Sequence, residues 1–432
     1  MSHSLSRRHF TLALTALGAS ALTPLARAAS GDSSGIETTD VTKPRILCYV
    51  GGYTKDAPPG VEGNGDGIVV FDMDRTTGVL TQIFTFMDIA SPSFITFSPD
   101  HRYLYAISEI DNYNKEGDGC VTAFAVNQHT GTLTKINTVS SGGAIPAHVS
   151  VHPSGKFVFV ANYMGGSVAV FPVKPNGGLA EASDIVHLTG PRQPERAADN
   201  PQGNFAVSDH SGSHPHMIAS NPNGRFVLAD DAGLDRIYVW RMDMKNGTLI
   251  PDTVPYYNLT PGCAPRHFVF NQAGTILYNL CEQDSKVLVS DFNPTTGAIT
   301  LIQSVSTVPP YFRGSTLAAE ILIDDTGKYV YVSNRLGDSL AIFAVGQDGT
   351  LTLQDEVWMH ADYGRAMMFD PTGTFLFCAN QRSDAVTSFR VNKVTGDVKF
   401  TRQYTPVGSP TTFAFLVTTP ALTTPALGGS NL

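Results

Sequence analysis

Cysteine, tryptophan and charged residues are all scarce in this chain of 432 residues. Two residues are tryptophan and only 16% are charged, and the five cysteines are Cys48, Cys120, Cys263, Cys281 and Cys378. The cysteines lack the paired spacing of metal ligands, and their odd number leaves at least one thiol free even if a disulfide forms. We therefore expect small buried side chains at most of these positions, no bound metal and no cofactor.

Basic residues are too few for a nucleic-acid-binding surface. The formal net charge is −9, whereas a phosphate backbone is bound by clustered Lys and Arg. After the N-terminal segment there is no run of about 20 apolar residues, the length that spans a bilayer. There is also no long amphipathic helical pattern. What remains is a β-rich globular chain, which we expect to form one domain and a monomer.

A small turn recurs in the chain at intervals of about 50 residues, a period typical of β-propeller blades. In each copy a glycine is followed two residues later by an aliphatic residue, between short stretches of alternating apolar residues. Glycine suits a tight hairpin because it adopts a positive φ without strain. The seven glycines are Gly78, Gly131, Gly177, Gly247, Gly297, Gly349 and Gly396.

A second turn, polar-Pro-x-Gly or a variant of it, recurs six times out of phase with the first, as in His152-Pro-Ser-Gly155. A strand rich in Phe, Tyr and Val follows it, as expected of a buried strand. The segment that starts at Ser409 resembles the strand before this turn but has no partner after it. The strand at Cys48 has no partner before it. We therefore predict an all-β, seven-bladed β-propeller whose first blade is closed by the C-terminal strand.

The first 28 residues have the features of an export signal. Arg7 and Arg8 precede an apolar stretch over residues 12–25, and small residues follow it, as in a twin-arginine-type signal peptide. We predict cleavage near Ala28, a periplasmic or secreted location and no membrane attachment afterwards. The expected organisation is then a flexible leader (29–44), the propeller (45–417) and a disordered tail (418–432) rich in Thr, Pro and Ala.

Polar residues recur at fixed distances from the polar-Pro-x-Gly glycines. Because the first strand of a blade starts where the second strand ends, both sets are predicted to meet at one mouth of the central channel. Seven or eight residues before the glycines lie His148, His216, Arg266, His267, Glu320 and Arg365. Seven or eight residues after them lie Asn162, Tyr163, Glu282, Asn334, Arg335, Asn380 and Gln381.

A mouth rich in Arg, His and Glu favours an anionic or oxygen-rich small molecule, because the guanidinium fork matches a carboxylate or phosphate. Arg365, Asn162, Asn334 and Gln381 are candidate substrate-binding residues on this ground, although for the asparagines a structural role is favoured, because Asn tolerates strained corners and bonds to local backbone. The longest insertions, residues 55–66, 110–119 and 187–214, fall on the same face, where loops shape binding sites. Whether 187–214 lines the pocket or covers a blade edge stays open.

Several segments of the chain resemble the seven-bladed lactonase family, which groups 6-phosphogluconolactonases with carboxy-cis,cis-muconate cyclases. They are Pro146-Ala-His-Val-Ser-Val, Ala161-Asn-Tyr, His214-Pro-His, Pro265-Arg-His-Phe, Ala319-Glu-Ile and Ser333-Asn-Arg. The resemblance covers about residues 45–417. It implies catalytic roles for His216, Arg266, Glu282 and Arg335, and substrate-binding positions at His148, His214, His267 and Glu320.

The resemblance implies a metal-independent lactonase that hydrolyses a sugar or other small lactone. Arg266 and Arg335 would stabilise the oxyanion, and Glu282 or His216 would act as general base on a water molecule. The same groups could serve a lactone-forming cycloisomerase, and a non-catalytic exported binding module is the third hypothesis. The clustering of ionisable groups at one mouth favours an enzyme. Export favours an unphosphorylated lactone over 6-phosphogluconolactone.

Overall fold

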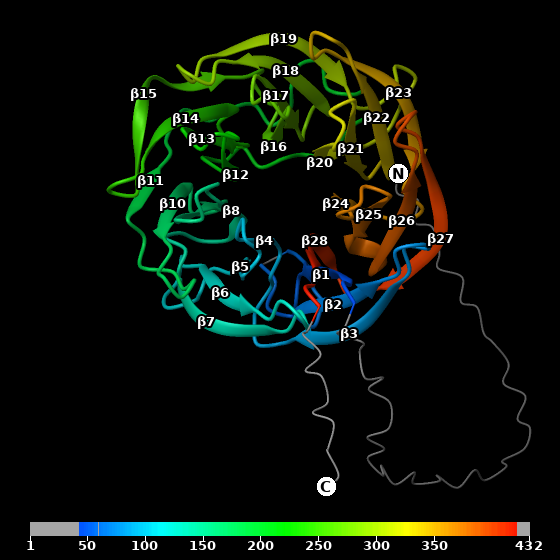
Figure 1. Ribbon diagram of the computed structural model, residues 1–432. Helices are drawn as coiled ribbons and strands as arrows, with labels where there is room; N and C mark the ends of the chain where they lie inside the picture. Colours follow the sequence, from blue (N-terminus) through cyan, green and yellow to red (C-terminus); the bar gives the residue numbers. More distant parts are fainter. Residues whose placement is uncertain (1–42, 59, 421–432) are drawn as a thin grey trace, which may run out of the picture. The chain divides into compact units, whose positions relative to one another are not determined.

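The computed structural model describes residues 43–58 and 60–420. Within them, 28 strands form seven four-stranded antiparallel sheets, and the helical content is the short 3-10 helix η1 (Gln381–Ser383). Figure 1 shows the sheets as blades arranged in a ring. The prediction of an all-β, seven-bladed propeller is confirmed. The segments predicted as signal peptide, as most of the leader and as most of the tail lie outside the described residues.

Each blade has its innermost strand at the axis of the ring and its fourth strand at the rim (Figure 1). From the axis outward, the first three blades are β28 (Pro410–Val417), β1 (Ile46–Gly52), β2 (Ile68–Met73) and β3 (Leu80–Phe86); β4 (Ile95–Phe97), β5 (Tyr103–Ser108), β6 (Cys120–Val126) and β7 (Leu133–Ser140); and β8 (Pro146–Val151), β9 (Phe157–Asn162), β10 (Ser167–Pro172) and β11 (Asp184–His187).

The remaining four blades repeat the same order. They are β12 (Pro215–Ser220), β13 (Phe226–Asp231), β14 (Arg236–Asp243) and β15 (Thr248–Asn258); β16 (Pro265–Phe270), β17 (Ile276–Cys281), β18 (Lys286–Phe292) and β19 (Ile299–Ser306); β20 (Leu317–Ile323), β21 (Tyr329–Arg335), β22 (Ser339–Val345) and β23 (Leu351–Trp358); and β24 (Gly364–Phe369), β25 (Phe375–Asn380), β26 (Ala385–Val391) and β27 (Val398–Pro406).

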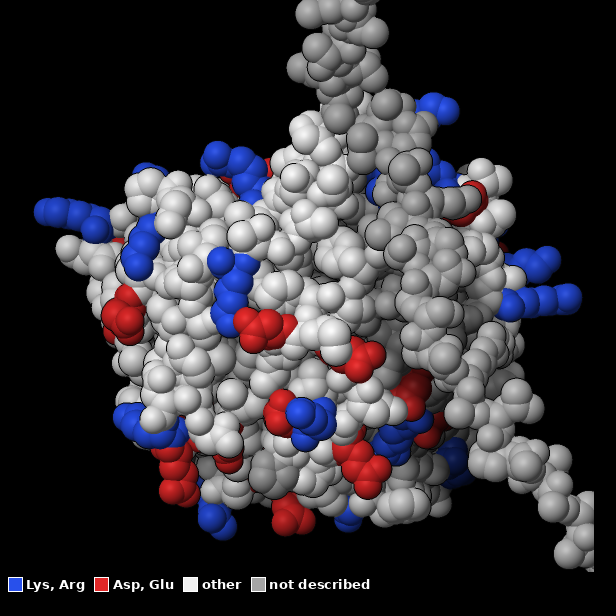
Figure 2. All heavy atoms as spheres, turned by 90° about the horizontal axis from the view of Figure 1, so that it is seen from below, with Lys and Arg blue, Asp and Glu red and all other residues white. Residues whose placement is uncertain are grey.

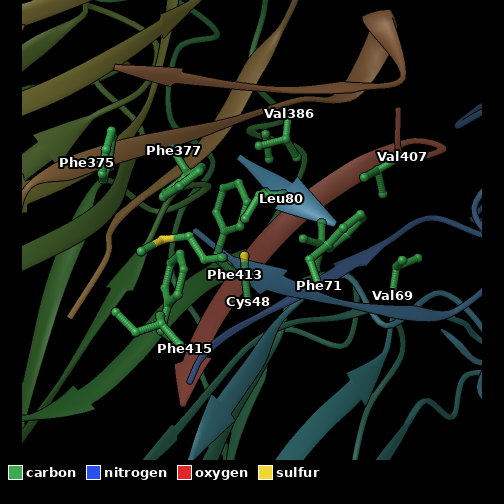
Figure 3. Packing of buried hydrophobic residues seen from close by; sticks show 14 of the residues in the cluster. Cys48, Val69, Phe71, Leu80, Phe375, Phe377, Val386, Val407, Phe413 and Phe415 are labelled. Carbon is green, nitrogen blue, oxygen red and sulfur yellow. The ribbon is translucent and has the colours of Figure 1, made fainter. Parts of the chain in front are cut away.

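The C-terminal strand closes the ring, as predicted. β28 pairs antiparallel with β1, and Ile46 lies opposite Val417. Each innermost strand contacts the next, in the order β28, β4, β8, β12, β16, β20, β24 and back to β28. Figure 3 shows the apolar seam at the closure, where Phe375 and Phe377 of the last blade pack beside Phe413 and Cys48 of the first.

Both repeated turns lie at the same ends of their blades, and both have glycine with a positive φ. The polar-Pro-x-Gly turns join the first and second strands, and the glycine turns join the third and fourth. Gly396, for example, has φ +77 and lies against Tyr329 at the start of β21 in the neighbouring blade. In four blades a buried tyrosine hydroxyl donates to the turn glycine of the next blade, as Tyr331 does to the carbonyl of Gly396 at 2.7 Å.

The surface carries charges of both signs. Figure 2 shows Lys and Arg interspersed with Asp and Glu on one side of the molecule, without a basic patch on that side. The fold thus places the apolar side chains between blades and leaves the mouth of the ring as the place where buried ionisable groups gather.

Candidate active site

The mouth residues come from β-bulges at the start of the innermost strands. In five successive blades the pairing with the second strand slips at this point, beginning between Pro146 and His148 in the third blade. A bulge inserts a residue that the partner strand does not pair, and it re-aims the side chains beside it. His216, Arg266, Glu320 and Arg365 all lie at such slips. The bulge explains why two consecutive residues of one strand can serve the same mouth.

Three predicted catalytic residues form one buried ion-pair cluster. Nε of Arg266 lies 3.1 Å from Oε2 of Glu282, and Nη2 of Arg335 donates to the same oxygen at 2.5 Å. Arg266 lies on β16, Glu282 follows β17 and Arg335 ends β21, so two blades meet in this cluster. The two arginines are 2% and 4% exposed, which strengthens their field by excluding water.

The ionisation states in this cluster are set by burial and by the opposite charges. Burial acts to raise the pKa of Glu282, but Arg335 and Arg266 hold it below its ordinary value. Burial lowers the pKa of Arg266 to about 9, helped by the charges of Arg335 and Arg365. At pH 7 the cluster therefore carries two positive charges and one negative charge, a surplus suited to an anion or an oxyanion.

Three histidines pack edge to face beside the cluster. The rings of His216 and His267 are 5.1 Å apart, and those of His148 and His267 are 5.8 Å apart. Burial is the main cause that holds the pKa of each well below 6.5, and the pKa of His216 is lowered further by Arg266. Nδ1 of His216 is buried without a hydrogen-bond partner. His216 is therefore a neutral imidazole with an unengaged ring nitrogen.

Glu320 is bound to His267 and not to the arginines. Its Oε1 lies 2.8 Å from Nδ1 of His267 and accepts a hydrogen bond from the backbone N–H of Ile321 at 3.2 Å. Burial raises the pKa of Glu320 to about 7. The hydrogen bond with Glu320 orients the His267 ring, which lies at the centre of the three histidines. Nη1 of Arg266 lies 3.3 Å from Nε2 of His267.

The open side of the mouth is a cavity of about 720 Å³ beside the last blade. Tyr363, Arg365 and Gln381 line it, together with Arg382 and the loop 60–64. Among the described residues, Arg365 makes no ion pair, and its guanidinium lies 5.3 Å above the ring of Tyr53. An unpaired guanidinium beside a cavity is a ready partner for an anionic or hydroxyl-bearing ligand.

Three other predicted binding residues are engaged within the fold. Asn162 donates to the carbonyl of Ser141 and the hydroxyl of Ser167. Asn334 binds Thr307 and Ser339 in the same way. His214 stacks on Tyr163 at 4.7 Å between ring centres, and its Nδ1 lies 3.0 Å from the Tyr163 carbonyl oxygen. These side chains support the walls of the mouth and are not brought into the cluster of Arg266.

The insertion over residues 187–214 reaches the cluster through one serine. The hydroxyl of Ser208 donates to Oε1 of Glu282 at 2.8 Å, and the backbone N–H of Ser208 donates to Gln283 at 2.6 Å. His210 lies 3.3 Å from Asp235, which anchors the insertion to the fourth blade. The role that the sequence left open is therefore decided: this segment lies on the mouth and touches the site.

Sequence reasoning missed Tyr53, Glu109 and Tyr363. Tyr53 donates to Oε1 of Glu109 at 2.9 Å, and both side chains are buried. Glu109 could have been found, because His101 has φ +56 and replaces the turn glycine, and Glu109 lies eight residues after it. Tyr363 precedes β24 and lies outside the counted positions, so the repeat carries no signal for it.

Other chemistry is limited in the described part of the chain. Its five cysteines are free and buried, as expected of small core side chains. Residues 43–58 and 60–420 contain no group of three or more His, Cys, Asp or Glu arranged to hold a metal ion. None of the helices described is long and apolar enough to cross a membrane.

The structure is therefore a seven-bladed propeller with a buried cluster of charged side chains at one mouth. A family model described as "Lactonase, 7-bladed beta-propeller" matches residues 47–415, and the chain belongs to this family. A relative from Bacillus subtilis (strain 168) named 6-phosphogluconolactonase is 30% identical over 374 residues, which cover 86% of this chain and 99% of the relative.

Solved structures similar to this chain are also described as lactonases. A Pseudomonas aeruginosa protein described as a periplasmic gluconolactonase is 28% identical with a TM-score of 0.75, covering 87% of this chain and 99% of that one. A Bacteroides fragilis protein described as a putative 6-phosphogluconolactonase has the same identity and TM-score, with 87% of this chain and 98% of that chain covered. The family resemblance seen in the sequence is confirmed.

Proposed function

We propose that the protein hydrolyses a sugar lactone, with Arg266, Arg335 and His216 at the reacting centre. The observation that carries the proposal is the convergence of Arg266 and Arg335 on Glu282 beside the unengaged ring of His216. Two buried guanidiniums stabilise the negative charge that develops on the carbonyl oxygen when water attacks a lactone. The relatives named 6-phosphogluconolactonase and gluconolactonase support this reaction class.

The general base of the proposed reaction is His216 and not Glu282. Two arginines bind Oε2 of Glu282 and Ser208 donates to Oε1, so both carboxylate oxygens are already engaged. His216 is neutral at pH 7 and keeps Nδ1 unengaged. In this scheme His216 takes a proton from water, Arg266 and Arg335 bind the oxyanion, and Glu282 holds the two guanidiniums in place.

The test is turnover of glucono-, galactono-, 6-phosphoglucono- and muconolactone by the mature protein, followed by proton release. We expect Arg266→Lys, which keeps the charge but loses the fork, and His216→Gln to lower kcat/KM on the best substrate by about 10²-fold or more. The control is Arg102→Ala, which replaces an exposed arginine in the turn before β5.

The pH dependence is a second test. Because the pKa of His216 lies well below 6.5, wild-type activity should persist at pH 6.5 and fall only at more acid pH. Full activity in both site variants would contradict the mechanism.

We also propose that the protein is exported by a twin-arginine-type signal and acts outside the cytoplasm. Support comes from Arg7 and Arg8 before the apolar stretch of residues 12–25, and from the relative described as periplasmic. Export favours an unphosphorylated lactone as substrate. Cell fractionation tests the proposal: Arg7→Lys with Arg8→Lys should leave the protein in the cytoplasm, and equal export of the variant would contradict it.

A further inference from the structure

Tyr363 stands at the cavity in a backbone conformation that bulky residues rarely adopt. It precedes β24 and has φ +66, a strained value for an aromatic residue. Hydrogen bonds from its N–H to Asp338 at 2.9 Å and from Gln381 to its carbonyl at 3.1 Å hold it there. A positive φ also occurs directly before β8, β16 and β28, at Ile145, Ala264 and Ser409. The conformation therefore belongs to the blade repeat, and in the last blade it places a phenol at the cavity.

The phenol of Tyr363 is enclosed by positive charge. The guanidinium carbons of Arg335 and Arg382 lie 5.1 Å and 3.9 Å from its ring centre, and Arg365 lines the same cavity. Nη1 of Arg335 donates to the phenolic oxygen at 3.3 Å. Within the described residues, no group accepts the phenolic hydrogen, so the O–H is free to donate to a molecule in the cavity.

The surrounding charges make this phenol a stronger acid than an ordinary tyrosine. Arg335 is the main cause that lowers the pKa of Tyr363, with Arg365 and Arg382 acting in the same direction. Burial and Glu282 oppose them. Because Arg335 also binds Glu282, the phenol is joined to the proposed oxyanion site by a single side chain.

We propose that Tyr363 is the catalytic acid of the reaction, donating its phenolic proton to the ring oxygen of the lactone as the ring opens. The inference rests on the proposed function. His216 removes a proton from the attacking water, and the new C–O bond forms a tetrahedral intermediate bound by the arginines. Collapse breaks the bond between the carbonyl carbon and the ring oxygen, which takes the Tyr363 proton. The proton held by His216 returns through water to the phenolate, so one lactone and one water give one hydroxy acid.

The decisive variant is Tyr363→Phe, which keeps the ring between the arginines and removes only the hydroxyl. With the lactone that the wild type turns over best, we expect kcat to fall by about 10²-fold or more, with a much smaller change in KM. Arg266, whose pKa is about 9, loses its charge at alkaline pH in both proteins. Because the wild type also loses the phenolic proton as the pH rises through the lowered pKa of Tyr363, below 10, its rate should fall more steeply than that of the variant. Tyr404→Phe, an exposed tyrosine on β27, is the matched control and should behave as wild type.

The outcomes separate the two proposals. No lactone turnover by the folded wild type would overturn the proposed function and the role of Tyr363 with it. A wild type that is active and a Tyr363→Phe variant with the same kcat would overturn the role of Tyr363 alone. A variant that loses kcat but whose rate falls with pH as steeply as that of the wild type would mean that Tyr363 only positions Arg335, which also overturns the proposal. The phenolate absorbance that the wild type shows and the variant lacks must appear below pH 10. Its appearance only above pH 10 would contradict the proposal.

Discussion

Single residues at the mouth hold one another in place through charge. Taking a carboxylate and two guanidiniums out of water costs several kcal/mol per ion, so such a cluster is a weak source of stability. In the proposed mechanism its benefit is a fixed field at the position where the oxyanion would form. Glu282 is the member that makes the cluster possible, because it neutralises part of the charge of Arg266 and Arg335.

Replacing Glu282 by Gln should destabilise the protein more than removing its serine partner. The variant leaves two buried guanidiniums uncompensated, and we expect the free energy of unfolding at pH 7 to fall by about 3–5 kcal/mol. Ser208→Ala removes one hydrogen bond to the same carboxylate and should cost about 1–2 kcal/mol. Urea unfolding measures both.

The difference in free energy of unfolding between the wild type and Glu282→Gln should also depend on pH. Because the pKa of Glu282 in the folded protein lies below its unfolded value of about 4.5, its contribution is present above that value. It is lost as the pH falls through the folded pKa. The difference in free energy of unfolding between the two proteins should therefore become smaller on acidification. A difference that stays constant from pH 7 to pH 3 would argue against the ion-pair cluster.

Within the elements, two local devices build the site and the scaffold. Bulges at the start of β12, β16, β20 and β24 turn otherwise paired residues toward the mouth. At the other end of the blades, turn glycines let neighbouring blades approach closely. A Cβ at Gly396 would lie 2.3 Å from the ring of Tyr329, far inside van der Waals contact.

Two turn glycines with the same backbone conformation allow a matched comparison. Gly396 has φ +77 and Gly327 has φ +69, but a Cβ at Gly327 would meet nothing within 4 Å. Gly327→Ala should cost only the strain of the left-handed conformation, about 1–2 kcal/mol. Gly396→Ala adds a clash with the next blade, and we expect about 2–4 kcal/mol in total. Equal losses in thermal or urea unfolding would show that the blade contact is unimportant.

For the whole molecule, closure of the ring is the dominant feature. β28 supplies the innermost strand of the first blade and contributes Phe413 and Phe415 to the apolar seam between the first and last blades (Figure 3). Without it, β1 would present an unpaired edge at the axis. Beyond β28, Thr418 still exchanges hydrogen bonds with Arg45, which fastens the end of the strand.

A chain that ends at residue 408 should fail to form a stable monomer. It lacks β28, so an apolar edge is exposed and the seam loses its aromatic side chains, which favours aggregation. The control ends at residue 420 and keeps every described contact, and it should unfold like the full chain. Size-exclusion chromatography and near-ultraviolet circular dichroism measure the result. A cooperative, monomeric protein from the shorter chain would contradict the role of closure.

The sequence by itself determined the blade count, the closing strand and most members of the mouth. These follow from local rules, since turn glycines, prolines and alternating apolar residues act over a few positions and repeat with the blade. The same repeat placed His216, Arg266, Glu282 and Arg335 at one end of the ring. The repeat did not lead to Glu109, because His101 stands where the other copies of the turn have glycine, and positions were not counted from this copy.

Only the tertiary structure decided which of these residues act together. The pairing of Arg266 and Arg335 with one carboxylate joins two blades, and the bulges that aim the side chains leave no mark in the periodic pattern. Asn162 and Asn334 lie at counted positions like Arg335, but each bonds to the loop that precedes its own blade and to the third strand of that blade. Tyr363 owes its acidity to arginines from β21, β24 and η1, which the packing of the last two blades brings around it. Electrostatic coupling depends on distance in space, and the ring sets that distance between residues far apart in the chain.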